Sequence, residues 1–254
     1  MIDFQMLYPY SAEMDRNEFF IQYFNPSALF RYDSNYFHLL YSPSKEEFQL
    51  TEDMHWFFSE DNGLGHVKFT WPKDQGLLPE TLDYLSEQGY GLEKLELYSI
   101  DPAFFKGVTA DNIQVTKVTH ERLDTFKTLN YIEDMKTSRY FADEKQGFYD
   151  LIFSDPLVTM WLALKDDQAV GSCITIDQSE TIEIDDVFTL PEHRGQNVAS
   201  TLQARVMAEG VKRNKRVILA ADAEDSVKDM YIKQGYTCEG FQIGAIRTLE
   251  EENE

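Results

Sequence analysis

Residues 186–201, DVFTLPEHRGQNVAST, constrain the fold more than any other stretch of the chain. The strand-like segment TIEIDDVFTL ends at Pro191, and a turn from Glu192 to Gln196 leads into the helical pattern NVASTLQARVMAEGVKR. The turn holds Arg194 and Gly195, a positive charge beside a flexible residue. Such a turn directs backbone N–H groups and a helix N-terminus at one point, which favours anions, phosphates above all. Because α/β proteins place ligands beyond the ends of strands, the stretch predicts an anion site.

Composition limits the partners of the chain. Its 254 residues are 43% hydrophobic and 14% aromatic, enough for one large domain or two ordinary ones. The net charge of −22 argues against binding of nucleic acid or an anionic membrane. Residues 189–249 escape this acidity, with nine basic and seven acidic residues, as an anionic ligand requires.

The two cysteines, Cys173 and Cys238, lie far apart in the sequence. They form neither a disulfide framework nor part of a metal-ligand cluster, so we expect no metal. The start of the chain, MIDFQMLYPY, lacks the basic and apolar regions of a signal peptide. No apolar run approaches the roughly 20 residues of a membrane span. These features predict a cytoplasmic protein.

Pro, Gly and an Asp-Asn pair in residues 100–112 mark a domain boundary, giving halves at 1–108 and 109–254. In the second half the pattern predicts a strand at 112–119, a helix from His120 capped by Thr119, and a second short helix at 143–154. Three strands follow, separated by the polar turns KDDQ and DQSE, which are typical of antiparallel hairpins. The long helix at about 197–213, a strand, a shorter helix and a final strand or pair complete this half.

The first half is dense in aromatic residues and harder to interpret. HVKFTWP predicts a strand, LPETLDYLSEQG a helix and LEKLELYSI another strand, an order that mirrors the end of the chain. LSEQGY at 85–90 also parallels YIKQGY at 231–236. A glycine after a helix is common without kinship, so the half is either a degenerate copy of the second or an independent α+β accessory domain.

Residues 112–248 resemble the GNAT superfamily of N-acetyltransferases. The stretch VFTLPEHRGQNVAS is similar to the family's strand and pyrophosphate-binding turn, Arg/Gln-x-x-Gly-x-Gly/Ala, with Arg194 in the first position and Ala199 in the last. Asn197 replaces the usual middle glycine, and Asn is the other residue that best tolerates a positive φ and also serves as an N-cap. The order of elements matches too, as does AEDSVKDMYIKQGY, with Tyr231 in the family's tyrosine position.

The resemblance implies an α/β (α+β) fold with a mixed, mostly antiparallel sheet flanked by helices. It implies acetyl-CoA as cosubstrate and no metal. The pyrophosphate would be held by backbone N–H groups from Gly195 through Gln196, Asn197, Val198 and Ala199 to Ser200, with added charge from Arg194. The backbone of Phe188 and Thr189 would bind the pantetheine arm. The basic run Lys212–Arg216 either complements the helix dipole or contacts the 3′-phosphate end of CoA.

For chemistry, the resemblance makes Tyr231 the acid that protonates the departing thiolate. A carboxylate on the strand before the turn would be the base, which leaves Glu183, Asp185 and Asp186. Alternation places Glu183 and Asp185 on one face and Asp186 on the other, so the choice stays open. His193, in the turn, is interpreted as a surface residue.

The resulting hypothesis is direct acetyl transfer to a primary amine in a ternary complex. The alternative is a GNAT-fold module that binds CoA as a sensor or docking surface without turnover. The acceptor could be a polyamine, an aminoglycoside, an amino acid or a protein N-terminus, with the acidic chain leaning toward a cationic one. The sequence does not give the oligomeric state; a dimer is one option.

Overall fold

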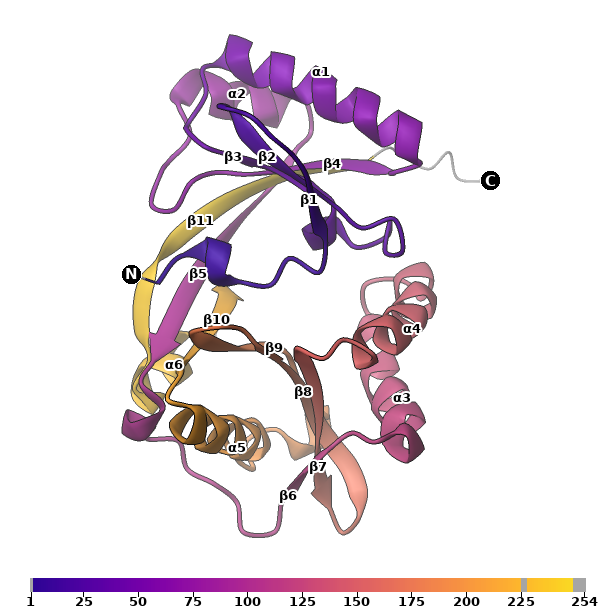
Figure 1. The fold of residues 1–254 in the computed structure, drawn as a ribbon, viewed down its shortest axis with the longest axis vertical. Coiled ribbons are helices and arrows are strands. Elements are labelled where there is room, and N and C mark those ends of the chain that lie inside the picture. The colour runs from indigo at the N-terminus through magenta and orange to yellow at the C-terminus, as the bar shows by residue number, and fades with distance from the viewer. Residues whose placement is uncertain (1, 225–227, 249–254) are drawn as a thin grey trace.

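An eleven-stranded twisted sheet runs through the part of the molecule that the computed structural model describes, residues 2–224 and 228–248 (Figure 1). The strands lie in the order β1-β2-β3-β4-β11-β5-β10-β9-β8-β7-β6. Their bounds are β1 Ala12–Arg16, β2 Phe20–Phe24, β3 Tyr36–Leu39, β4 His66–Thr70, β5 Gly91–Ile100, β6 Gln114–Lys117, β7 Val158–Lys165, β8 Gln168–Asp177, β9 Thr181–Thr189, β10 Arg216–Asp222 and β11 Thr237–Thr248.

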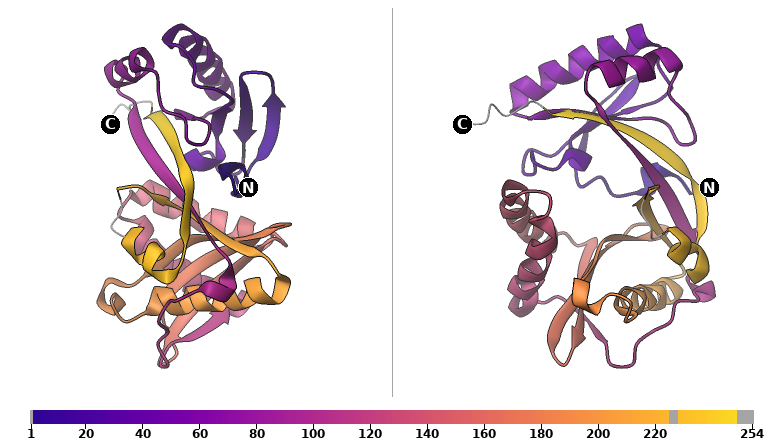
Figure 2. Two further views of the ribbon diagram at one scale, coloured as in Figure 1. Left: turned by 90° about the vertical axis from the view of Figure 1, so that its left-hand side faces the viewer. Right: turned by 180° about the vertical axis from the view of Figure 1, so that it is seen from behind.

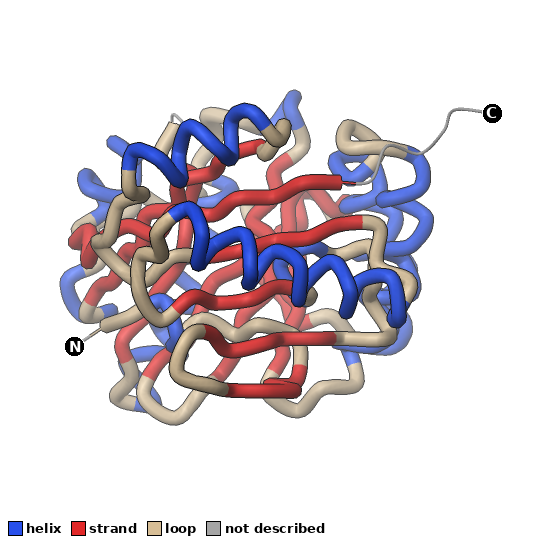
Figure 3. The backbone as a smooth tube through the Cα atoms, turned by 90° about the horizontal axis from the view of Figure 1, so that it is seen from above, coloured by secondary structure: helices blue, strands red, loops and turns tan. Residues whose placement is uncertain are grey.

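Helices cover both faces of the sheet in the second half of the chain and one face in the first. The α-helices are α1 Lys45–Asn62, α2 Pro79–Glu87, α3 Leu123–Asp134, α4 Arg139–Phe153, α5 Val198–Arg213 and α6 Lys228–Gln234. Short 3-10 turns are η1 Phe4–Met6, η2 Tyr32–Ser34, η3 Pro102–Phe104, η4 His120–Arg122 and η5 Pro191–His193. Figure 3 shows α1 and α2 lying over the strands of the first half.

The predicted mixed, mostly antiparallel fold of the second half is confirmed. β7, β8 and β9 are antiparallel neighbours, and β9 pairs with β10 in parallel. Asp166 and Asp167, with φ of 50° and 62°, form the β7–β8 turn, which suits a two-residue hairpin. The helix expected from His120 begins instead as a 3-10 turn, and Thr119 makes no side-chain cap bond. The final segment is one strand, β11, with a bulge between Cys238 and Gly240.

Three apolar cores hold the layers together. One packs α5 and Tyr231 against Ile182 and Ile184 of β9. A second packs α3 and α4 against the opposite face of β7 and β8. A third lies under α1 and is dominated by aromatic side chains, such as Trp71 and Phe48, which explains the aromatic density of the first half.

The element order of the first half repeats that of the second. The series β1-β2-β3-α1-β4-α2-β5 corresponds to β7-β8-β9-α5-β10-α6-β11, and both β3–β4 and β9–β10 are parallel pairs. The sequence Gln-Gly-Tyr stands at the C-terminal end of both α2 and α6, with Gly89 and Gly235 just beyond the helices at φ of 75° and 100° and both tyrosines buried. The first half has no counterpart of α3 and α4 in the described residues before β1.

The two halves exchange their last strands. β5, the last strand of the first half, pairs with β10 of the second, while β11, the last strand of the second half, pairs with β4 of the first. β5 and β11 also pair with each other and span the molecule from one half to the other (Figure 2). Residue 108, near the predicted boundary, lies in the segment between η3 and β6. The sheet itself passes through both halves.

Candidate active site

The turn before α5 is built from two left-handed residues. Gly195 has φ of 73°, and Asn197, at the N-cap, has φ of 61° and ψ of 21°. Asn tolerates this region better than other non-glycine residues, so Asn197 keeps the backbone conformation that glycine would give. Its side chain makes no cap hydrogen bond, contrary to the capping role considered from the sequence.

The N-terminus of α5 is consequently open, whereas that of α1, its counterpart in the first half, is closed. Ser44 and Glu47 form a complete capping box on α1, and Glu46 adds a second acid to its first turn. The first turn of α5 holds neither a side-chain cap nor an acidic residue. Uncapped N–H groups and the helix dipole attract an anion, while carboxylates in the same place repel one. The electrostatics thus favour α5 over α1 as an anion-binding helix.

The accessible part of the turn is its first half. Residues 194–197 are exposed and Ala199 is half-buried, whereas Val198 packs into the core and Ser200 is covered by the linker at Gly107. Arg194 Nε donates to the carbonyl of Thr189 at 3.3 Å, and Gln196 accepts from Lys165 Nζ at 3.0 Å.

Buried polar atoms without a partner concentrate around this turn. In the described part of the chain seven such side-chain atoms occur, and three of them lie between positions 189 and 200: Thr189 Oγ1, His193 Nδ1 and Ser200 Oγ. Buried polar groups are normally hydrogen-bonded. The packing around the turn therefore leaves hydrogen-bonding capacity unfilled. His193, half-buried rather than fully exposed, departs from the surface position expected.

Strands β9 and β10 separate just before this turn. Their pairing covers only three residues and ends at Glu183 opposite Ile218. Beyond this point β9 keeps β8 on one side, and in the described residues no strand pairs with its other side. The backbone of Phe188 and Thr189 therefore lies on an edge that a ligand chain can approach.

A β-bulge reorders the carboxylates of β9. The register with β8 shifts between Ser172 and Ile174, and Asp186 has φ of 50°. Ile182 and Ile184 face the core under α5, but Phe188 faces the opposite core, beside α4. The bulge thus brings Asp186 to the same side as Asp185, and the prediction that the two lie on opposite faces is wrong. Strict alternation fails here because the extra residue shifts the register.

Glu183 is buried behind the site. Only 6% of it is exposed, and its Oε2 accepts from the backbone N–H of Tyr8 at 2.7 Å. Burial, helped by the charge of Asp185, raises the pKa of Glu183 well above its usual value.

Asp185 is the most accessible of the three candidate bases, with 34% of its side chain exposed. Its Oδ2 accepts from the Tyr10 hydroxyl at 3.0 Å and lies 3.8 Å from Arg31 Nη2. Both partners come from the first half of the chain, which therefore contributes to the surroundings of Asp185 on β9.

Asp186 is bound by one cation and one hydroxyl of α4. Lys145 Nζ lies 3.0 Å from Asp186 and 2.8 Å from Asp134, and the Tyr149 hydroxyl donates to Asp186 at 3.0 Å. Burial works to raise the pKa of Asp186, but the Lys145 ammonium and these hydrogen bonds outweigh it and hold that pKa below its usual value. A carboxylate held ionised in this way is a poor proton acceptor.

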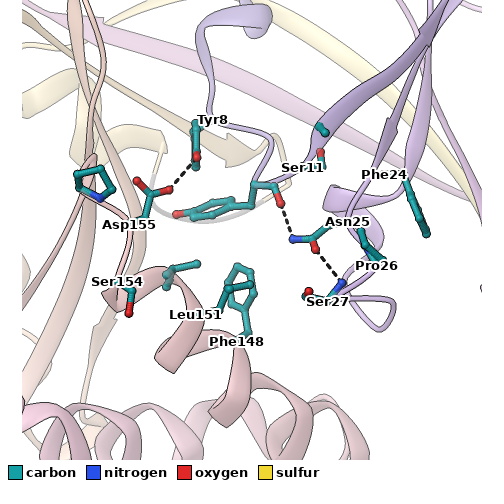
Figure 4. A pocket seen from close by; sticks show the side chains of 14 residues that line it. Tyr8, Ser11, Phe24, Asn25, Pro26, Ser27, Phe148, Leu151, Ser154 and Asp155 are labelled. Carbon is teal, nitrogen blue, oxygen red and sulfur yellow. Dashed lines mark hydrogen bonds between the residues drawn. The ribbon is translucent and has the colours of Figure 1, made fainter.

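Two cavities open between the halves, and only the smaller one is lined by carboxylates of β9. The smaller, about 200 Å³, is lined by Asp185, Asp186 and residues of η2 and α4. The larger, about 660 Å³, lies between the segments flanking β1 and β2 and the end of α4, where the Tyr8 hydroxyl donates to Asp155 (Figure 4). Tyr10 and Phe148 line both. Glu183 lines neither.

Tyr231 lies on the other side of β9. It is 8% exposed and packs between the rings of Tyr98 and Tyr236, in the core that contains Ile182 and Ile184. Strand β9 itself therefore separates Tyr231 from the carboxylates Asp185 and Asp186. A single ligand can contact residues on both faces of β9 only if it passes through the gap between β9 and β10.

The basic run at the end of α5 is engaged elsewhere. Arg213 and Lys215 both pair with Asp177 at the end of β8. These ion pairs leave the two side chains less available for contact with the 3′-phosphate end of CoA.

A scan against protein families matches residues 123–236 to the acetyltransferase (GNAT) family. This match spans α3 to α6, including the open turn and the parted strands. Residues 123–236 are a GNAT domain. Residues 2–98 match a domain of unknown function, DUF5613. A comparison with curated proteins returns no match.

Solved structures share the fold of the whole chain as well as that of the GNAT domain. A functionally unknown conserved protein from Staphylococcus epidermidis superposes with a TM-score of 0.88 at 22% identity, covering 97% of this chain and 98% of its own. A GCN5-related N-acetyltransferase from Kribbella flavida has a TM-score of 0.58 at 12% identity, covering 83% and 80%. A tandem GNAT protein from the clavulanic acid biosynthesis pathway has a TM-score of 0.56 at 9% identity, covering 81% and 70%.

Sequence reasoning placed the turn, Tyr231 and the β9 carboxylates but missed the residues that surround Asp185. Tyr10 and Arg31 come from the first half and Lys145 from α4. No motif marks them, and only the aromatic density of the first forty residues hinted at a packed surface there. In the described residues no helix is long and apolar enough to cross a membrane, and no three metal-ligating side chains cluster.

Proposed function

We propose that the chain is an acetyl-CoA-dependent N-acetyltransferase that acts on a primary amine by direct transfer. The observation that carries the proposal is the uncapped N-terminus of α5, placed where β9 and β10 part and with a carboxylate-lined cavity on the far side of β9. The exposed turn residues Arg194–Asn197, with Ala199, would hold the pyrophosphate, and the free edge of β9 at Phe188 and Thr189 would bind the pantetheine arm. Acetyl-CoA supplies the acetyl group as an activated thioester.

The residues around the gap divide the proton transfers. Asp185, which lines the cavity, would hold the acceptor and take the proton that its nitrogen loses as the C–N bond forms. Glu183, buried and with a raised pKa, would position Asp185 rather than touch the amine. Tyr231, on the other face, would give a proton to the sulfur as the C–S bond breaks. The direct attack needs no covalent acetyl-enzyme, and Cys173 is buried in the core.

The first test is binding, because it precedes any choice of acceptor. Acetyl-CoA and CoA are expected to raise the Tm of the full chain, by mass action on the folded state. A Tm unchanged at millimolar acetyl-CoA would contradict both the enzyme and a CoA-binding module.

The second test is turnover, measured as CoA thiol release with a panel of amines. Asp185→Asn and Tyr231→Phe are each expected to lower kcat by roughly 10²-fold or more, with acetyl-CoA still raising the Tm. Tyr236→Phe is the matched control, since its hydroxyl bonds only to Gln203 in the described structure. Binding without turnover on any amine would instead support the non-catalytic module.

A further inference from the structure

The smaller cavity presents an arginine whose bonding is incomplete. Arg31 donates through Nη1 to Ser34 Oγ at 3.0 Å, and its Nη2 lies 3.8 Å from Asp185, too far for a hydrogen bond. Among the described residues no acceptor reaches Nε or Nη2. Only 20% of the side chain is exposed, and a desolvated guanidinium with unfilled donors is costly unless water or a ligand fills them.

The orientation of Arg31 is fixed by aromatic rings. Its guanidinium carbon lies 4.3 Å from the centre of the Tyr10 ring and 5.1 Å from that of Phe148. Both rings also line the cavity. A planar guanidinium held by its faces leaves its edge for a planar, bidentate acceptor, and a carboxylate has that geometry.

The other charges of the cavity are already matched. Lys145 lies between Asp134 and Asp186, and Asp33 pairs with Lys68. Asp185 and Arg31 remain, an ion pair at 3.8 Å with no hydrogen bond between the two side chains. One anion and one cation thus face the cavity side by side.

We propose that the acceptor is an α-amino acid with an apolar or aromatic side chain, bound with its amine at Asp185 and its carboxylate on Arg31. This rests on the proposed function and narrows its substrate. In an α-amino acid the amine and the carboxylate share one carbon, which matches receptors 3.8 Å apart. A polyamine would leave the donors of Arg31 unfilled and place a second cation beside them.

The walls of the cavities accommodate the side chain. Phe30, Phe141 and Phe148 line the smaller cavity, and through Tyr10 and Phe148 it adjoins the larger one, which Phe24, Leu151 and Ile152 help to line. Apolar groups gain by burial against such walls. We therefore expect discrimination in favour of large apolar side chains.

The test compares acceptors that differ only at the carboxylate. With the full chain and saturating acetyl-CoA, kcat/KM is measured for L-phenylalanine, L-phenylalaninamide, phenethylamine and spermidine. The expected result is at least a tenfold preference for L-phenylalanine over the other three. Equal or better use of phenethylamine, the amide or spermidine would overturn the inference.

The role of Arg31 is tested by Arg31→Gln. KM for L-phenylalanine is expected to rise at least tenfold, while kcat/KM for phenethylamine changes less than threefold, so that the preference disappears. A merely structural arginine would instead impair both acceptors alike. Arg205→Gln is the matched control, because Arg205 also stacks on an aromatic ring, Trp161, but lies on α5.

The outcomes separate this inference from the proposed function. If acetyl-CoA raises the Tm and amines without a carboxylate are acetylated best, the inference fails and the proposed function stands. If acetyl-CoA binds but no acceptor in the panel is used, the inference also fails. If acetyl-CoA does not bind at all, both fail together.

Discussion

At the scale of single residues, conformation matters as much as chemical type. Asn197 differs from the glycine of the family pattern, but its φ of 61° gives the turn the same left-handed step. Its side chain leaves the N–H groups of α5 uncapped. The substitution is therefore compatible with an open anion site, which follows from the backbone angle and not from the name of the residue.

Replacement of Asn197 tests this account. Asn197→Gly is expected to bind acetyl-CoA at least as tightly as the parent, whereas Asn197→Val should bind roughly tenfold more weakly, because a β-branched residue disfavours positive φ by about 1–2 kcal/mol. Affinity is measured by titration calorimetry.

Asn214 is the matched control, since it ends the same helix with φ of 55°. Asn214→Val should lower the Tm without weakening acetyl-CoA binding. Equal affinities for the glycine and valine variants at 197 would refute a role for the left-handed turn.

At the scale of elements, the start of α5 is held close to the sheet by a glycine. A Cβ at Gly171 of β8 would lie 2.7 Å from Val198 Cγ1 and 2.8 Å from the carbonyl oxygen of Phe188. The position therefore joins the first residue of α5 to the edge of β9 that the proposed cofactor would use.

Gly171→Ala is expected to destabilise the protein by about 1–3 kcal/mol through overpacking and to weaken acetyl-CoA binding by displacing α5. Thermal unfolding and calorimetry measure the two effects. Gly147→Ala is the control: Gly147 lies on α4 with open space around it, so alanine there should stabilise the helix by about 0.5–1 kcal/mol. An unchanged affinity in Gly171→Ala would show that the site tolerates movement of α5.

The elements of the first half carry three buried histidines, His38 on β3, His55 on α1 and His66 on β4. Burial lowers the pKa of His38 and of His66 to about 4, and that of His55 to about 3. Unfolded histidine titrates near 6.5, so the stability they contribute is present above pH 6.5 and is lost as pH falls toward these values. Each should cost about 2 kcal/mol between pH 6.5 and 5.

Unfolding free energy measured against pH tests this. His38→Gln, which retains a hydrogen-bonding side chain, should reduce the loss between pH 6.5 and 5 by about 2 kcal/mol. The raised pKa of Glu183 acts in the opposite direction, adding stability as pH falls toward 4.5. This contribution is the same in the parent and in His38→Gln, so it cancels in their comparison. His120→Gln, at an exposed position, is the control. Parallel pH profiles for His38→Gln and the parent would contradict the expectation.

At the scale of the whole molecule, the strand exchange makes the halves depend on each other. Without β11, β4 loses a neighbour along five residues, and without β5, β10 loses one along six. The exchange also fixes the first half over the GNAT domain, which brings Tyr10 and Arg31 to Asp185.

Fragments 1–108 and 109–254 are therefore each expected to lack a cooperative thermal transition when produced separately, since each exposes an unpaired strand edge. Mixed or co-expressed, they should elute together and recover a transition. Circular dichroism and size-exclusion chromatography provide the measurements. A cooperative transition in 109–254 alone would mean that the domains predicted from the sequence fold independently despite the exchange.

The sequence by itself determined the local structures of the second half: the strand–turn–helix at 186–201, the hairpins before it and the position of Tyr231 on α6. These depend on periodicity and turn chemistry within a few residues, so the pattern suffices. Only the tertiary structure decided that a bulge turns Asp186 toward Asp185, that Arg31 lies beside them, and that β5 and β11 each pair with a strand of the other half. Bulges and strand pairings are fixed by partners distant in the sequence, through packing and hydrogen bonds that no local pattern records.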